Sequence, residues 1–316
     1  MSTIYLTEAG MEVTKDGGSI VFTNIDGKRT ELPSNYVTAL VVMSKVQISH
    51  NVMLELLRND GKVIYLDKYG KVLGKVTNNE GSGRALVNQV EAYRDEAKRL
   101  SLAKYIVAKK IDGEIKLLEY INKRIKSEEI SKAFKKLKLF KNLVDKQKDE
   151  EQLMGIEGMC ARIYFGCFSL LIKNNAFSWQ GRKKHPAPDP VNALLSYTYA
   201  LVEKDIRIAL ADTDLALSVG YLHSLDNRKD SLVYDLLEIF RASVADKFVL
   251  RFINLQMAHS EDFVQENGRC FMSKELLKKF IAAYEDYAGD FNKEDCAREM
   301  INREVSDFKK MICKNE

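Results

Sequence analysis

The chain has 316 residues, of which 46% are hydrophobic and 30% are charged, and its formal net charge at pH 7 is +4. This length suggests about two domains, and the composition excludes a chain too polar to form a core. The longest apolar runs, residues 36–43 and 163–172, are shorter than the roughly 18 residues that a membrane span needs. There is no signal-peptide pattern, and the five scattered cysteines form no CxxC pair. We therefore expect a cytoplasmic protein without a disulfide framework or a thiolate zinc site.

Short runs of β-branched or aromatic residues predict strands in the first part of the chain. They span residues 20–23, 37–42, 63–66 and 72–76. Turn signals that contain glycine separate these runs, and one helix is predicted over residues 50–58, with Ser49 as a candidate side-chain cap. The pattern predicts a small β-rich domain over residues 1–80.

Helical periodicity replaces the strand pattern after a Gly-Ser-Gly segment, and apolar residues recur with helical spacing over residues 86–107. Prolines gather in residues 178–190, which predicts a loop, and Asp189 can cap the helix that follows it. We therefore expect an α+β protein with a small N-terminal β-rich domain, a hinge at residues 81–85 and a larger all-α domain over residues 86–316.

A strong excess of positive charge lies between Lys98 and Lys148, where 16 Lys and Arg residues are set against 6 Asp and Glu residues. Because clustered cations gain free energy by releasing counterions from phosphates, this asymmetry favours a polyanionic partner. A solvated helix face explains the charge alone equally well, since lysine is a good helix former.

Two carboxylates, Asp235 and Glu238, lie at positions i and i+3 of an otherwise apolar segment. On one face of a helix they would lie about 5–6 Å apart and repel each other. A divalent cation would stabilise the pair, and His223, which precedes it, is a ligand that Mn²⁺ also accepts. The alternative is that Asp235 makes a local cap or ion pair, while Glu238 pairs with Arg241 or Arg207.

Glu157 is a third acidic candidate, flanked by Gly155 and Gly158 just before a segment that is predicted to be buried. Buried charge must be paired or bound to a ligand, and glycines allow a ligand or another backbone to approach closely. The alternative is a buried ion pair between Glu157 and Arg162. Near the loop at residues 178–190, Asn192 could bind phosphate or lie on a solvated face.

Several ordered segments together resemble one family, the CRISPR-associated integrase Cas one, which is the DNA-joining subunit of the spacer-acquisition complex. They are residues 46–49, 60–66, 155–165, 188–199, 220–223 and 234–241. The resemblance covers nearly the whole chain. It implies a metal-dependent DNA endonuclease and integrase of CRISPR adaptation, an antiviral defence. Such an enzyme joins the 3′-hydroxyl ends of captured DNA fragments into the CRISPR repeat by phosphodiester transesterification, and hydrolysis appears as nuclease activity.

The resemblance also implies the site residues. Glu157, His223 and Glu238 would be catalytic and would bind Mg²⁺ or Mn²⁺, and Asp235 would be an additional ligand or a supporting acid. The residues expected to bind DNA are Arg162, Arg182, Lys183, Lys184 and Asn192. No Gly-rich phosphate loop is present, so no nucleotide cofactor is expected. Many relatives have prolines where this chain carries Ile239 and Ala242, so we expect a straighter helix here.

The expected partners are double-stranded DNA, as captured fragment and as CRISPR repeat, a second copy of the chain, and the small adaptation protein Cas two. The resemblance assigns dimerisation to residues 1–80. Two alternatives to an integrase stay open on the residues alone: a non-catalytic scaffold that bridges DNA, and a structure-selective nuclease that acts on branched DNA in repair.

Overall fold

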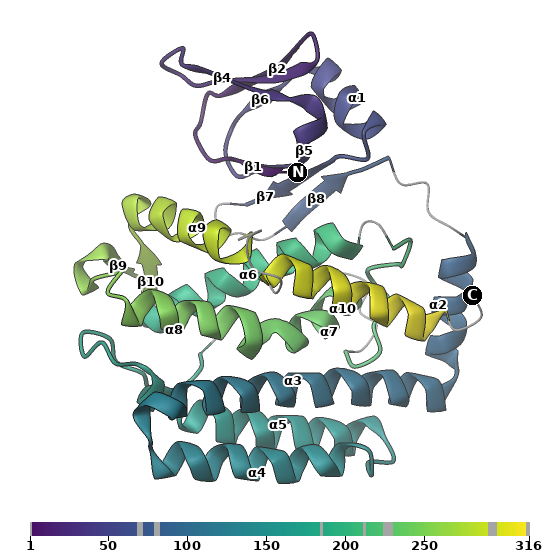
Figure 1. Ribbon diagram of the computed structural model, residues 1–316, viewed down its shortest axis with the longest axis vertical. Coiled ribbons are helices and arrows are strands. Elements are labelled where there is room, and N and C mark those ends of the chain that lie inside the picture. Colours follow the sequence, from purple (N-terminus) through teal and green to yellow (C-terminus); the bar gives the residue numbers. More distant parts are fainter. Residues whose placement is uncertain are drawn as a thin grey trace. The chain divides into compact units, whose positions relative to one another are not determined.

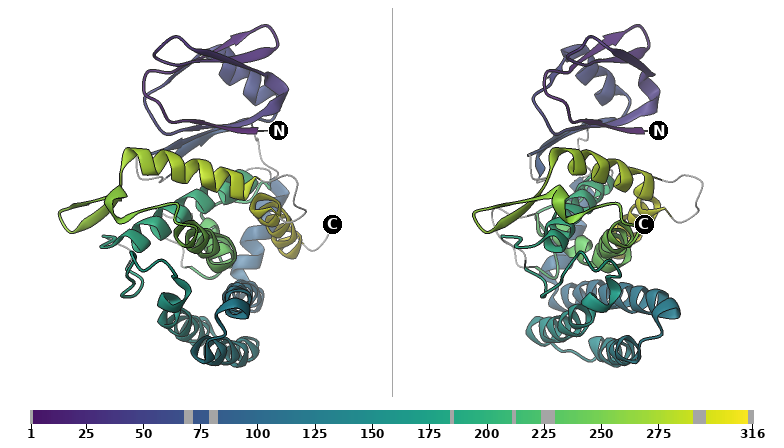
Figure 2. Two further views of the ribbon diagram at one scale, coloured as in Figure 1. Left: turned by 60° about the vertical axis from the view of Figure 1, so that its left-hand side comes forward. Right: turned by 90° about the vertical axis from the view of Figure 1, so that its left-hand side faces the viewer.

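A computed structural model describes residues 2–67, 72–78, 83–183, 186–210, 213–223, 230–289 and 296–313. The chain divides into two compact units, residues 1–82 and 83–316. The first unit is rich in strands and the second is mostly helical, as Figures 1 and 2 show. This confirms the α+β class with the β-rich part first.

In its described residues the N-terminal unit contains two four-stranded sheets and one α-helix, α1 (His50–Arg58). The first sheet has the order β1-β5-β7-β8, in which β1, β5 and β7 are parallel and β8 is antiparallel to β7. Its strands are β1 (Ser2–Leu6), β5 (Val37–Val42), β7 (Lys62–Leu66) and β8 (Val72–Val76). The second sheet, of order β4-β3-β2-β6, consists of β4 (Arg29–Pro33), β3 (Ser19–Thr23), β2 (Glu12–Asp16) and β6 (Gln47–Ile48). A short 3-10 helix, Ser34–Tyr36, precedes β5.

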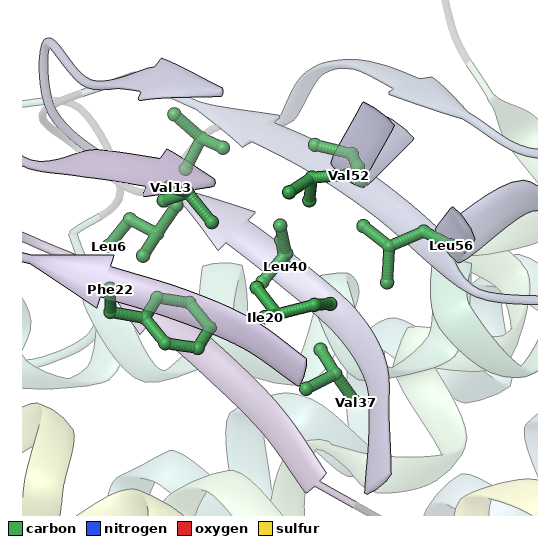
Figure 3. Packing of buried hydrophobic residues seen from close by; sticks show 10 residues of the cluster. Leu6, Val13, Ile20, Phe22, Val37, Leu40, Val52 and Leu56 are labelled. Carbon is green, nitrogen blue, oxygen red and sulfur yellow. The ribbon is translucent and has the colours of Figure 1, made fainter. Parts of the chain in front are cut away.

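Apolar side chains from both sheets and from α1 form the core of this unit, as Figure 3 shows. Leu6, Ile20 and Leu40 are fully buried from the strands, and Val52 and Leu56, one turn apart, contribute one face of α1. The predicted strand runs all fall within observed strands. The predicted cap of α1 is wrong, because the side chain of the residue before it accepts no hydrogen bond from the helix.

The second unit is built from nine α-helices in its described part. They are α2 (Gly83–Arg94), α3 (Glu96–Ile125), α4 (Glu128–Val144), α5 (Glu150–Gly166), α6 (Pro190–Leu210), α7 (Ser231–Phe240), α8 (Lys247–Asn254), α9 (Lys274–Ala288) and α10 (Ala297–Ile312). Short 3-10 helices span Phe168–Leu171 and Ser260–Asp262. Side chains at the helix starts accept backbone N–H groups, as Asp95 does for α3 and Asp149 for α5. Asp189 accepts from Asn192 N at 2.9 Å and so caps α6, as predicted.

Three helices, α3, α4 and α5, lie side by side, and α3 also packs against α7 (Figure 1). Helix α7 packs on its other side against α6, which is buried along most of its length. The long helix α3 thus contacts both α5 and α7, which α6 separates in the sequence, and brings their faces toward one place in space. None of the described helices combines the length and the apolar character needed to cross a bilayer.

Two sequence predictions about the second unit are corrected. The unit is not all-α, because β9 (Phe263–Glu266) and β10 (Arg269–Met272) form an antiparallel hairpin. Its turn is Asn267-Gly268, where both residues have positive φ, as a tight hairpin turn of this kind requires. In the predicted hinge at 81–85, residues 83–85 form the start of α2, and residues 81 and 82 lie outside the described residues.

The helix after the acidic pair is not a plain α-helix either. Helix α7 runs into a π-helical segment, Arg241–Asp246, and continues as α8. The helical path is thus continuous through Ile239 and Ala242, with one wider, π-helical stretch at Arg241–Asp246. Turns of this kind often occur at functional sites.

Candidate active site

A pocket of about 360 Å³ lies at the junction of α3, α5 and α7. It is lined by Lys110, Met154, Glu157, Ala161, Phe165, Arg182, Leu222, His223, Glu238 and Arg241. The three residues predicted to bind a metal are all among them, and they come from α5, from the segment before α7 and from α7 itself. The fold therefore brings together side chains that are far apart in the sequence.

Asp235 fixes the segment that carries His223. Its buried carboxylate accepts the backbone N–H groups of Tyr221, Leu222 and His223, at 2.5, 3.0 and 3.0 Å. The same carboxylate lies 2.7 Å from Nδ1 of His223. Because a carboxylate accepts, Nδ1 carries the proton, and Nε2 is the ring nitrogen that can bind a metal. Asp235 therefore acts here as an orienting group for the imidazole.

Gly220 makes this anchoring possible. A Cβ atom at this position would lie 2.7 Å from Oδ2 of Asp235 and 2.8 Å from the backbone of Ser231. Neither neighbour can move freely, since one is the anchor and the other is the first residue of α7. The glycine is required by the close approach of the chain to the start of α7.

Lys110, on α3, connects the two predicted glutamate ligands. Its ammonium forms an ion pair with Glu157 and lies 2.6 Å from Oε2 of Glu238. The other oxygen of Glu238 lies 2.9 Å from Nη2 of Arg241. The side chain of Lys110 is only 8% exposed, so the two carboxylates share a cation that is largely removed from water.

Burial and the neighbouring charges shift the pKa values of the groups in this cluster. Burial opposes ionisation of Glu238, but Lys110 and Arg241 outweigh it and lower the pKa of Glu238 to about 2. Burial likewise opposes the charge of Lys110, and the carboxylates of Glu238 and Glu157 raise its pKa above the ordinary value. Burial raises the pKa of Glu114, one helical turn from Lys110, to about 8 against the attraction of that ammonium. The cluster is thus arranged to keep Glu238 ionised.

The donor set fits a hard divalent cation. Glu157 and Glu238 provide carboxylate oxygens on either side of a shared positive charge, and His223 is oriented by Asp235 in the same pocket. Oε2 of Glu238 is buried and accepts no hydrogen bond of good geometry from a described residue. As they stand, however, no three histidine, cysteine or acidic side chains in the described part of the chain are arranged to hold one ion. The ammonium of Lys110 occupies the space between the two glutamates.

Two arginines on the pocket wall are held by a buried aromatic network. The guanidinium groups of Arg182 and Arg241 lie 5.2 and 4.9 Å from the ring centre of Tyr199. The hydroxyls of Tyr199 and Tyr164 donate to Asp246 at 2.7 and 2.8 Å. Burial raises the pKa of Asp246 to about 6, although both tyrosine hydrogen bonds favour its charged form. The network holds two cations beside the carboxylate cluster.

Asn192 has a different role from the predicted one. It is fully buried, so it does not present its amide to DNA, and the prediction of a direct contact is wrong for this structure. Its Oδ1 accepts from Arg182 Nη1 and from the backbone N–H of Lys183, both at 2.9 Å. Its Nδ2 donates to Gly181 O and to Asp189. Asn192 therefore ties the basic loop to the start of α6.

The other residues predicted to bind DNA lie in different places in the structure. Arg162 is exposed on α5 and does not line the pocket, and the ion-pair partner of Glu157 is Lys110 instead. Lys183 belongs to the loop at the pocket edge, and Lys184 lies outside the described residues. The alternative reading of Glu238 is partly correct, because it does pair with Arg241. Arg207 pairs with Glu203 and Asp230.

The basic segment between Lys98 and Lys148 forms α3 and α4, and it mixes internal and exposed cations. Ion pairs hold several of them, such as Lys109 with Glu304 and Lys141 with Asp112. Others are exposed, namely Lys116, Lys123, Arg124, Lys126, Lys135 and Lys136. Part of the charge is therefore structural, and the exposed part is available to a polyanion.

Lys110 lines the pocket, although the sequence alone predicts no role for it there. In the sequence it is one of the many cations between Lys98 and Lys148. Its position indicates that it is buried, because Ile106, Lys110 and Glu114 lie one turn apart on a helix face that is otherwise apolar. Charged residues on a buried face need partners, and this pattern distinguishes Lys110 from its exposed neighbours.

Comparison with known proteins gives consistent results. The family model described as CRISPR associated protein Cas1 matches residues 4–286. Among curated relatives, a CRISPR-associated endonuclease Cas1 of Chlorobaculum tepidum is 29% identical over 90% of this chain and 85% of its own length. One from Clostridium perfringens is 25% identical over 100% of this chain and 97% of its own length.

Solved structures share the fold at lower identity. A Cas1 protein from Thermotoga maritima has a TM-score of 0.83 at 21% identity and covers 98% of this chain and 97% of its own. A casposase bound to its integration product has a TM-score of 0.82 at 21% identity and covers 100% and 92%. The Cas6-RT-Cas1–Cas2 complex contains a chain with a TM-score of 0.81 at 19% identity, covering 100% of this chain and 35% of that one. Since the family model matches most of its length, this chain belongs to the Cas1 family.

Proposed function

We propose that the chain is a metal-dependent DNA endonuclease and integrase of CRISPR adaptation. It would join the 3′-hydroxyl end of a captured DNA fragment to a phosphate at the boundary of a CRISPR repeat by transesterification, with hydrolysis when water attacks instead. The names of its relatives, CRISPR-associated endonuclease, support the nuclease class. The fold shared with a casposase bound to an integration product is consistent with joining as well as cutting.

The observation that carries the proposal is the meeting of Glu157 and Glu238 on one buried positive charge, with His223 in the same pocket. Two carboxylates from separate helices would repel each other at this distance without a cation. An imidazole oriented through its Nδ1 by a buried carboxylate is a frequent arrangement of metal-binding histidines. The three side chains together offer the oxygen and nitrogen ligands that Mg²⁺ or Mn²⁺ accepts.

Each residue then has a distinct task. Glu157, His223 and Glu238 would hold a divalent ion, which would stabilise negative charge on the phosphate and on the leaving oxygen. Asp235 would orient His223, and Arg182 and Arg241, which line the same pocket, would attract the DNA phosphate. No covalent nucleophile from the chain is needed, because the attacking group is the 3′-hydroxyl of DNA or water.

The partners follow from the same family. We propose that the exposed cations of α3 and α4, with Lys183, bind the DNA backbone without reading bases. A solved Cas1 relative is bound to DNA, and another lies in a complex with Cas2. We extend both partners to this chain, together with a homodimer formed through the N-terminal unit.

The test is strand joining on supercoiled DNA that carries a CRISPR repeat, with a labelled DNA fragment, Mn²⁺ or Mg²⁺ and the small partner. Glu157→Gln, His223→Ala and Glu238→Gln should each retain DNA binding and lose joining by at least about a hundredfold. Glu119→Gln is the matched control, because Glu119 pairs with Lys138 at the surface, away from the pocket. It should keep full activity.

Two outcomes would replace the proposal. DNA binding without any cleavage or joining in Mn²⁺ would indicate a scaffold that bridges DNA. Efficient cleavage of a branched junction, with no preference for the CRISPR repeat, would indicate a structure-selective repair nuclease.

A further inference from the structure

The ammonium of Lys110 stands in the space that a divalent ion would need. It contacts Glu157 and lies 2.6 Å from Oε2 of Glu238, so it touches both carboxylates that the proposed function assigns to the metal. An ammonium and a divalent ion cannot occupy one place, and their charges repel strongly in a site removed from water. If the ion binds there, Lys110 must move.

Glu114 offers a second place for that ammonium. It lies one turn after Lys110 on α3, and side chains four residues apart share a helix face. The residue is only 2% exposed, and its Oε2 atom is buried without a hydrogen-bond partner among the described residues. A buried, unsatisfied carboxyl is costly, so a structural reason for keeping it is expected. The flexible four-carbon stem of lysine can reach either group by rotation.

We propose that Lys110 is a resident cation that holds Glu157 and Glu238 together until a divalent ion binds, and that it then moves to the carboxyl of Glu114. The inference rests on the proposed function, because it needs the ion to bind at the two glutamates. It assigns Lys110 and Glu114 as positioning residues that tune metal affinity. Arg241 lies 2.9 Å from Oε1 of Glu238, the oxygen that Lys110 does not contact, and would keep this contact in both arrangements.

Two consequences distinguish this device from a merely structural ion pair. Since the ammonium competes with the ion, removing it raises metal affinity, whereas loss of a purely structural lysine would lower affinity by disordering the ligands. Since Glu114 receives the ammonium, its removal weakens metal binding only when Lys110 is present. The second consequence is a coupling between two side chains, which a double-mutant cycle measures.

The first experiment titrates Mn²⁺ into the full chain by isothermal titration calorimetry, without DNA. Lys110→Met should bind Mn²⁺ about tenfold more tightly than the unaltered chain. Its melting temperature should be lower without Mn²⁺, because the carboxylates lose their cation, and should rise more on adding Mn²⁺. Lys109→Met is the matched control: Lys109 is the adjacent residue, pairs with Glu304 outside the pocket and should leave Mn²⁺ affinity unchanged.

The second experiment replaces Glu114 in both backgrounds. Glu114→Gln should weaken Mn²⁺ binding about tenfold in the unaltered chain and have little effect together with Lys110→Met. Equal effects of Glu114→Gln in the two backgrounds would overturn the proposal. So would a Lys110→Met chain that folds and binds Mn²⁺ no more tightly than the Lys109→Met control. If Lys110→Met folds only in the presence of Mn²⁺, that dependence itself supports a resident cation.

Failure of the proposed function gives a different pattern. Glu157→Gln should abolish Mn²⁺ binding at the site in every background. If Mn²⁺ binds the unaltered chain and Glu157→Gln alike, the metal site itself is wrong, whatever Lys110 does. If Mn²⁺ binding depends on Glu157 but not on Lys110 or Glu114, the metal site stands and only the resident-cation proposal fails.

Discussion

Asp235 binds His223 twice, through its backbone N–H at 3.0 Å and through its ring Nδ1 at 2.7 Å. One buried carboxylate thus sets both the path of the chain and the orientation of the imidazole. We predict that Asp235→Asn lowers Mn²⁺ affinity by about 10–100-fold, because the amide cannot replace both acceptor oxygens. Calorimetric titration of the folded variant measures this change. An affinity within twofold of the unaltered chain would contradict the orienting role.

Gly220 gives a second prediction, about stability. Gly220→Ala should lower the free energy of unfolding by about 2–3 kcal/mol, since its Cβ would lie 2.7 Å from Asp235 Oδ2. Urea denaturation followed by circular dichroism measures the loss. Gly155→Ala is the control: a Cβ there meets nothing within 4 Å, so its stability should be unchanged or slightly higher. Equal losses in the two variants would show that the close approach at Gly220 is unimportant.

The buried carboxyl of Asp246 gives a prediction about pH. Burial raises its pKa from 3.8 to about 6, so the folded chain holds a proton that the unfolded chain has already released. The folded state therefore loses up to about 3 kcal/mol of stability as the pH rises from the ordinary pKa of 3.8 to the raised pKa of about 6. Asp246→Asn should remove this pH dependence. The unfolding free energy of the variant, relative to that of the unaltered chain, should therefore increase from pH 4 to pH 6. A constant difference over that range would contradict it.

The arginine on the loop provides a prediction about DNA. Arg182→Ala should weaken binding of double-stranded DNA and reduce the slope of log affinity against log salt by about one, if it contacts one phosphate. Fluorescence anisotropy at several salt concentrations gives both quantities. Lys310→Ala, which removes an exposed cation of α10, is the control. A slope that Arg182→Ala leaves unchanged would show that the guanidinium serves only the network around Tyr199.

Much of the fold was predictable because local patterns and packing agree. The strand runs of the N-terminal unit are bounded by turns, β3, β5 and β7 are buried at most of their positions, and Asp189 caps α6 as its position indicates. The single apolar helix face predicted over residues 86–107 is not continuous, because Asp95 starts a new helix and interrupts the periodicity. Leu86 is consequently 44% exposed, while Gln89 is buried. The Asn267-Gly268 hairpin was missed although its turn signal is strong.

The sequence predicts the residues of the candidate site, but it does not predict which side chains pair with one another there. Glu157, His223 and Glu238 line one pocket, as the family resemblance implies. The helical pattern around Lys110 indicates a buried position but not its partners, because these lie on α5 and α7 and are brought to it only by tertiary packing. The burial of Asn192 is likewise a property of the loop that folds over α6.

The most direct measurement is pulsed electron paramagnetic resonance of Mn²⁺ bound to the chain. It should detect a bound ion with magnetic coupling to an imidazole nitrogen. That coupling should vanish in His223→Ala, and bound Mn²⁺ should disappear in Glu157→Gln and in Glu238→Gln. Bound Mn²⁺ without nitrogen coupling, or full binding after loss of either glutamate, would contradict the convergence of these three side chains on one ion.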